Sequence, residues 1–132
     1  MTEDEVNIKV KDWLVNQGYH YKGVLNVGKG QISVPDGSRQ VLIDHQGIKD
    51  NPIDLIWIEA KGEAGMSTLL QGFIRVQYAV YHGGGTGFLA VPHTQYKQML
   101  EQKEFLNSVS EAVNGRGQVG LLNVEKNMTT VF

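Results

Sequence analysis

Glu59 and Lys61 are the residues whose types and spacing first suggest chemistry. They close the run Ile53-Asp-Leu-Ile-Trp-Ile-Glu-Ala-Lys61, which is apolar at nearly every earlier position apart from Asp54. Such a run predicts a central strand covered on both faces, and residues two apart on a strand project from the same face. Charges buried at such a strand end cost several kcal/mol unless they are paired, bound to metal or facing a cleft. We therefore expect Glu59 and Lys61 to mark a functional site.

A carboxylate beside an amine suits metal-assisted hydrolysis. The glutamate and a second carboxylate can hold a hard cation that activates water, while the lysine positions the nucleophile or neutralises charge. The alternative is an ordinary ion pair at a strand end. Glu-x-Lys is a common tripeptide, and Glu101-Gln-Lys103 in the same chain predicts only a solvated helix face. The surrounding elements must therefore decide between the two readings.

The elements before this strand are predicted from capping and turn residues. Thr2 and Glu5 form a capping-box pattern, and the apolar spacing that follows predicts a helix over residues 3–17. Turn-forming residues then separate short runs at 31–34, 40–44 and 53–61. We expect these runs to form an antiparallel meander.

The elements after the strand predict a parallel crossover and a closing hairpin. Helical spacing over 67–82 is followed by a buried strand at 88–91, so strand, helix and strand occur in sequence. A third helix is expected over 94–113. The final runs, 119–124 and 128–132, predict a hairpin around the turn Glu125-Lys-Asn127.

Composition bounds the class of protein. A chain of 132 residues with 41% hydrophobic and 20% charged residues predicts a single domain over 1–132. With no cysteine, disulfides, thiolate zinc sites and cysteine nucleophiles are excluded. No apolar run approaches a bilayer-spanning length and the first residues are acidic, so we expect no membrane association and a cytoplasmic location. The net charge of −2 provides no overall basic field for nucleic acid.

The order of these elements, together with Glu59-Ala-Lys61, resembles the PD-(D/E)XK nuclease superfamily. The resemblance covers about residues 3–92 and rests on arrangement more than on individual letters. It implies an α/β fold of the α+β mixed-sheet kind, with a restriction-endonuclease-like αβββαβ core and an additional C-terminal helix and hairpin. It also implies a metal-dependent phosphodiesterase, here an endonuclease or exonuclease acting on DNA.

The superfamily pattern needs an upstream aspartate, and three residues could supply it. If the strands turn at Asp50-Asn-Pro52, Asp44 falls across the hairpin from Glu59, at an interval that resembles the family's spacing. If they turn at Gln46-Gly-Ile48 instead, Asp36 comes opposite Glu59. Asp54 is five residues before Glu59 and so points to the other face of a regular strand. We expect Asp44, with Asp36 as the second choice.

Two further features bear on the resemblance. Gln77-Tyr-Ala-Val-Tyr81 looks like the Gln-x-x-x-Tyr helix motif of the superfamily branch similar to the RecB nucleases. The resemblance implies that Gln77 orients the site and that Tyr81 contacts substrate. A core tyrosine beside an incidental glutamine explains the two residues equally well. Glu5 is better explained as a helix cap than as an extra metal ligand. His45 is left out of the catalytic set, because a lone strand histidine is usually a packing or surface residue.

The site expected from the resemblance holds Mg²⁺ or Mn²⁺ through Asp44, Glu59 and the carbonyl of Ala60, while Lys61 assists the attack of water. The expected partner is DNA, and a homodimer would let two sites cut both strands. One alternative function is a non-catalytic module of the same fold that binds nucleic acid or protein. Another is a small structural subunit whose hairpin edges pair with a partner chain.

Overall fold

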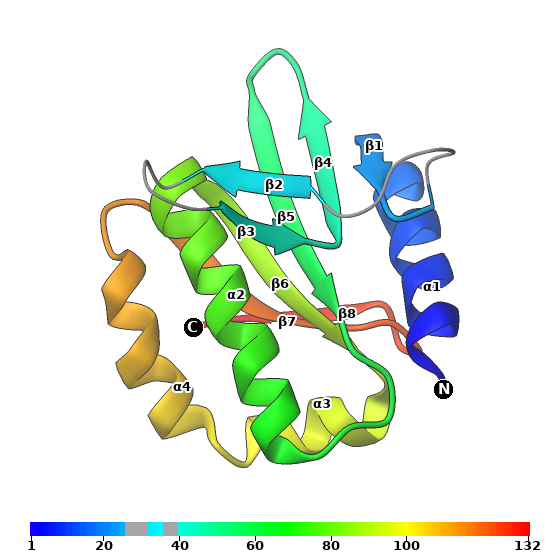
Figure 1. Ribbon diagram of the computed structural model, residues 1–132, viewed down its shortest axis with the longest axis vertical. Coiled ribbons are helices and arrows are strands. Elements are labelled where there is room, and N and C mark those ends of the chain that lie inside the picture. Colours follow the sequence, from blue (N-terminus) through cyan, green and yellow to red (C-terminus); the bar gives the residue numbers. More distant parts are fainter. Residues whose placement is uncertain (26–31, 36–39) are drawn as a thin grey trace.

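A six-stranded mixed sheet forms the centre of the computed structural model, which describes residues 1–25, 32–35 and 40–132 (Figure 1). The first three strands pair antiparallel, the next two continue in parallel with the third, and the last is antiparallel. In spatial order the strands are β1 (His20–Gly23), β4 (His45–Lys49), β5 (Asp54–Ala60), β6 (Gly85–Val91), β7 (Gly117–Asn123) and β8 (Met128–Val131). The broad prediction of a mixed α/β fold is confirmed.

Helix α1 (Glu3–Asn16) covers one face of this sheet. Its start is fixed by the predicted capping box, in which Thr2 and Glu5 satisfy each other's backbone N–H groups. The fully buried side chains Val6, Val10 and Leu14 recur at helical spacing and pack against the even-numbered residues of β5. The predicted first helix is therefore confirmed.

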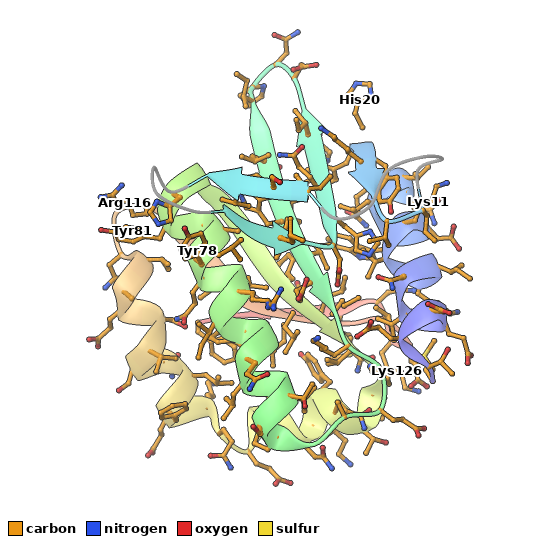
Figure 2. All side chains as sticks on the ribbon, in the orientation of Figure 1. Lys11, His20, Tyr78, Tyr81, Arg116 and Lys126 are labelled. Carbon is orange, nitrogen blue, oxygen red and sulfur yellow. The ribbon has the colours of Figure 1, made fainter. Side chains whose placement is uncertain are left out.

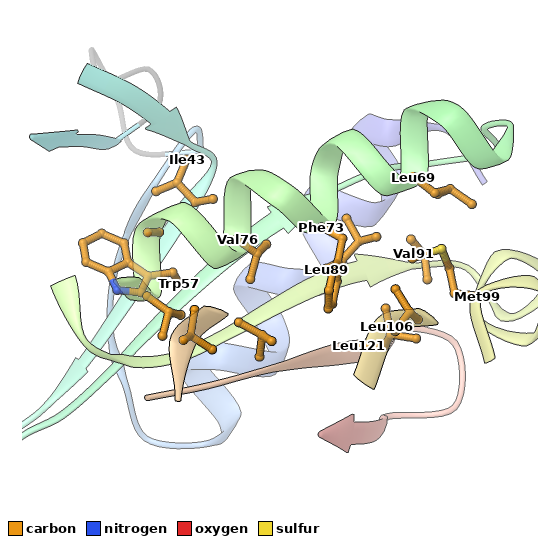
Figure 3. Close-up of a cluster of buried hydrophobic side chains, with 14 of the residues drawn as sticks. Ile43, Trp57, Leu69, Phe73, Val76, Leu89, Val91, Met99, Leu106 and Leu121 are labelled. Atoms are coloured by element: carbon orange, nitrogen blue, oxygen red, sulfur yellow. The ribbon is translucent and has the colours of Figure 1, made fainter. Parts of the chain in front are cut away.

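The other face of the sheet carries α2 (Met66–Gly83), α3 (His93–Leu100), α4 (Lys103–Ser110) and the short 3₁₀ turn η1 (Glu111–Val113). Figure 3 shows Leu69, Phe73 and Val76 of α2 packed over Leu89 and Leu121 of the strands. The prediction of one helix over 94–113 is wrong. The side chains of residues 101–104 are polar and exposed, so no apolar side chain packs this segment against the core. One helix ends at Leu100 and the next begins at Lys103.

The predicted meander is also wrong in part. Strands β2 (Ile32–Pro35) and β3 (Gln40–Ile43) pair only with each other, as a separate hairpin on the α2 side of the sheet (Figure 1). The run that continues from β3 bends at Asp44 and enters the main sheet as β4, the true neighbour of β5. Ile43 is buried with the α2 cluster, which explains why this part of the run leaves the sheet.

The turn between β4 and β5 lies at residues 50–53, which includes the predicted Asp50-Asn-Pro52. The connection from β5 through α2 to β6 is parallel, as predicted, and β7 and β8 form the predicted closing hairpin. Within residues 1–25, 32–35 and 40–132, no helix has the length and apolar character needed to cross a bilayer.

Candidate functional site

Asp44 and Glu59 lie side by side at the junction of three strands. The register of β4 on β5 pairs His45 with Ile58, which brings the preceding Asp44 opposite Glu59. The backbone N–H of Asp44 donates to Glu59 Oε1 at 3.2 Å, and the N–H of Ala60 donates to Asp44 Oδ2 at 2.9 Å. Each carboxylate thus accepts a hydrogen bond from the backbone of the segment that carries the other acid. The predicted juxtaposition is confirmed, whereas the catalytic role of the two acids stays a prediction.

The two carboxylates are buried in an unfavourable electrostatic environment. Asp44 is 7% exposed and Glu59 1%. Burial first, and then the charge and hydrogen bond of Asp44, raise the pKa of Glu59 to about 8, against the opposing effects of Lys61 and Arg75. A carboxylate pair with this property gains from any added positive charge, because the charge offsets both the lost hydration and the mutual repulsion.

Lys61 connects the acid pair with the surface. Its side chain is 23% exposed, and its Nζ lies 3.8 Å from Glu3 Oε1 at the start of α1. The neighbouring Gly62 permits this approach, since a Cβ there would meet the backbone N of Glu3 at 2.6 Å. Lys61 therefore pairs with the N-terminal turn of α1, while its charge still acts on Glu59.

A pocket of about 650 Å³ opens beside Lys61. It lies between the first turn of α1 and the segment that joins β5 to α2. Its lining residues are Met1, Thr2, Glu3, Glu5, Lys61, Gly62, Glu63, Ala64 and Thr68. Asp44 and Glu59 are not among these residues, so the ammonium group of Lys61 is what the pocket and the acid pair share.

Arg75 of α2 is the second cation at the site, and sequence reasoning missed it. Its Nε lies 3.9 Å from Glu59 Oε2. In the sequence it is one charged residue between the apolar Phe73 and Val76, and helical spacing alone places it on a face with Thr68 and Gly72. Only the packing of α2 on β5 reveals that this face meets Glu59, so the sequence carried no sufficient signal.

His45 follows Asp44 in the chain but belongs to the opposite face of the sheet. It is fully buried, with Nε2 2.6 Å from Asn7 Oδ1 and Nδ1 2.7 Å from the Tyr21 hydroxyl. Because the Asn7 oxygen can only accept, Nε2–H donates to it and Nδ1 accepts from Tyr21. Burial lowers the pKa of His45 to about 4, against the opposing effect of Asp44. A neutral histidine with both ring nitrogens hydrogen-bonded fits the structural role expected for it.

The remaining acidic candidates are accounted for separately. The Asp54 carboxylate accepts a 2.7 Å hydrogen bond from Tyr19, which packs against the α1-side cluster, so Asp54 lies on the face opposite Glu59, as predicted. Glu5 serves the capping box of α1. Asp36 lies outside the described residues.

Gln77 and Tyr81 are not brought to the acid pair. Gln77 Nε2 donates to the Val109 carbonyl at 2.6 Å, at the end of α4. The Tyr81 ring lies 4.5 Å from the guanidinium of Arg116, and Figure 2 shows these two residues together with Tyr78 at one side of the molecule. The expectation that Gln77 and Tyr81 face the catalytic strand is therefore wrong, because that face of α2 packs toward α4 and η1.

The donor set at the acid pair fits Mg²⁺ or Mn²⁺ better than a softer metal. Asp44 and Glu59 supply carboxylate oxygens, and Mg²⁺ needs only one or two carboxylates and keeps several waters; the Ala60 carbonyl stays a predicted ligand. Within the part of the chain that the structure describes, no group of three or more His, Cys, Asp or Glu side chains could hold a metal. Any ion here must therefore complete its shell with water or substrate oxygens.

No family model matches the chain, and no curated protein or solved structure gives a significant match to it.

Proposed function

We propose that the protein is a metal-dependent phosphodiester hydrolase that acts on DNA, with a site of the PD-(D/E)XK type. The observation that carries the proposal is the reciprocal bonding of Asp44 and Glu59, with Lys61 two residues further along. The order of α1, the antiparallel strands β1, β4 and β5, then α2 and the parallel β6 is compatible with a restriction-endonuclease-like core. The β2–β3 hairpin would be an insertion into it.

Each residue of the site has a defined task in this proposal. Asp44, Glu59 and the carbonyl of Ala60 hold Mg²⁺ or Mn²⁺, which supplies an activated water and a Lewis acid when bound. Glu59 gives up its proton as it takes up the ion, because its pKa of about 8 leaves it mostly protonated at neutral pH. Lys61 neutralises charge on the phosphate and orients the attacking water from the pocket side.

The near-neutral charge of the chain is compatible with this function. Although the net charge is −2, the positive groups Lys61 and Arg75 are concentrated where the acids lie, and a bound divalent ion adds two more charges. Glu3, Glu5 and Glu63 also line the pocket, so in this proposal the charge of the bound ion is what makes the local field favourable to a phosphate.

The test is cleavage of single-stranded, duplex and branched DNA with Mg²⁺ or Mn²⁺. We expect wild type to cleave at least one form, and Lys61→Ala to lower the rate by about 10²-fold or more, since it removes a charge that acts in the transition state. Lys126→Ala is the matched control, because Lys126 is exposed in the β7–β8 turn, and it should cleave at the wild-type rate. Failure of wild type on every DNA form, or cleavage undiminished by Lys61→Ala, rejects the proposal.

The burial of both carboxylates favours one alternative, a non-catalytic binding module of the same fold in which the acids only brace the sheet. Calorimetry with Mn²⁺ separates the two functions. A binding site lost in Glu59→Gln supports the hydrolase. The absence of any Mn²⁺ site in wild type, with DNA binding retained, supports the binding module.

A further inference from the structure

Arg75 has a guanidinium group that its present contacts use only in part. It projects from the middle of α2, with its side chain 49% exposed. Its Nη1 donates to the Leu42 carbonyl of β3 at 3.5 Å, and its Nε lies 3.9 Å from Glu59 Oε2. A guanidinium carries five N–H donors. Among residues 1–25, 32–35 and 40–132, Arg75 thus reaches the buried acid and keeps donors for a further acceptor.

The contact between Arg75 and Glu59 is not the close geometry of a dedicated ion pair. Charge-assisted bonds between arginine and carboxylate have N–O distances of about 2.7–2.9 Å and are often bidentate. At 3.9 Å, through Nε alone, the guanidinium gains little of that energy. An ion bound to Glu59 would replace this counter charge, and the guanidinium would then be available to another anion.

Lys61 and Arg75 are two cations close to Glu59, and the charges of both oppose the rise in its pKa. Thr68, Gly72 and Arg75 lie on one face of α2, and Thr68 lines the pocket with Lys61. Gly72 is buried, and a Cβ there would meet Leu89 Cδ1 at 2.8 Å and Lys61 Cε at 3.4 Å, so α2 packs closely on β6 and on the Lys61 side chain. Lys61 therefore lies against α2 at Gly72, about one helical turn before Arg75.

We infer that Arg75 binds a backbone phosphate of the DNA on the β3 side of Glu59, while Lys61 serves the phosphate on the pocket side. The inference rests on the proposed nuclease function. It adds a substrate-binding residue and a path for the DNA backbone across the protein. The DNA backbone runs along α2, from its first turn at Thr68 toward Leu42. The guanidinium is suited to this contact because its planar donors match phosphate oxygens.

The experiment measures the salt dependence of DNA binding by fluorescence anisotropy, with Ca²⁺ replacing Mg²⁺ and a labelled duplex as probe. Losing one phosphate contact reduces the slope of log K against log salt by about 0.9. We expect this reduction, with about tenfold weaker binding, for Arg75→Gln. Arg75→Lys should largely restore the slope. The control Arg116→Gln should leave it unchanged, because Arg116 stacks on Tyr81 away from the site.

A second variant separates a phosphate contact from a simple counterion of Glu59. If Arg75 only neutralises Glu59, Arg75→Gln has no effect on DNA binding in a Glu59→Gln background, and that result overturns the inference. An unchanged slope in the single variant, or no DNA binding by wild type, overturns it as well. Cleavage with Mg²⁺ is scored independently. A wild type that does not cleave, but loses slope with Arg75→Gln, keeps the phosphate contact and rejects the nuclease.

Discussion

Asp44 and His45 are adjacent in the chain, yet they belong to two buried polar clusters of opposite character. On the α1 face, His45 is neutral and both its ring nitrogens are bonded, to Asn7 and Tyr21. On the α2 face, Asp44 stands against Glu59, another acid. One cluster is complete within the protein, whereas the other holds two acids whose ionised forms repel each other and would be stabilised by an added cation. Burial is common to both, so the difference in charge is what identifies the candidate site.

The complete cluster should respond most strongly to loss of a side chain. His45→Ala removes a fully buried ring and leaves the polar atoms of Asn7 and Tyr21 without their partner, which we expect to lower the free energy of unfolding by about 3 kcal/mol. Chemical denaturation at pH 7 measures this. His20→Ala is the control, because His20 is exposed on β1, and should change the value by less than about 0.5 kcal/mol. Equal effects would show that the His45 cluster contributes no special stability.

The second prediction concerns the pH dependence of stability, in which the two clusters act in opposite directions. The pKa of Glu59 rises from 4.5 to about 8 on folding, so the native state keeps a proton that the unfolded state loses, and stability falls as pH rises toward 8. The pKa of His45 falls from 6.5 to about 4, so stability is lost instead as pH falls through that range. Above about pH 7.5 the histidine is neutral in both states, and only the Glu59 effect remains.

The Glu59 contribution to the free energy of unfolding should therefore fall by about 1.6 kcal/mol between pH 6.5 and 8, because its slope of about 1.4 kcal/mol per pH unit halves as the pH reaches its pKa. Denaturation curves at a series of pH values measure the decline without divalent ions. Glu59→Gln should remove it, because an amide does not titrate. A decline of equal size in Glu59→Gln would assign it to other groups and remove the electrostatic contrast between the two clusters.

The sequence predicted the acid pair better than it predicted the sheet around it. The turn at 50–52 could be predicted from the sequence, and the pairing of Asp44 with Glu59 followed from it, because the register of a hairpin is set by its turn. The separate β2–β3 hairpin was not predicted, because the expected strand ended at Asp44, whereas β4 begins at His45 and only the tertiary packing of Ile43 takes β3 out of the main sheet. Arg75 was missed for the same reason, since the face of α2 that meets Glu59 depends on packing.

The smallest expected effect is stabilisation by a divalent ion, and it tests whether the incomplete cluster is a binding site. A ligand at ten times its Kd stabilises the native state by about 1.4 kcal/mol. We expect Mn²⁺ to raise the Tm of wild type accordingly, and to do so more strongly at pH 8 than at pH 6, because less Glu59 must then lose its proton. Glu59→Gln and Asp44→Asn should abolish the rise, and the control Asp54→Asn should keep it, since Asp54 lies at the far end of β5. A rise in Tm that survives Glu59→Gln places the ion elsewhere, and the acid pair on the α2 face would then have no part in binding it.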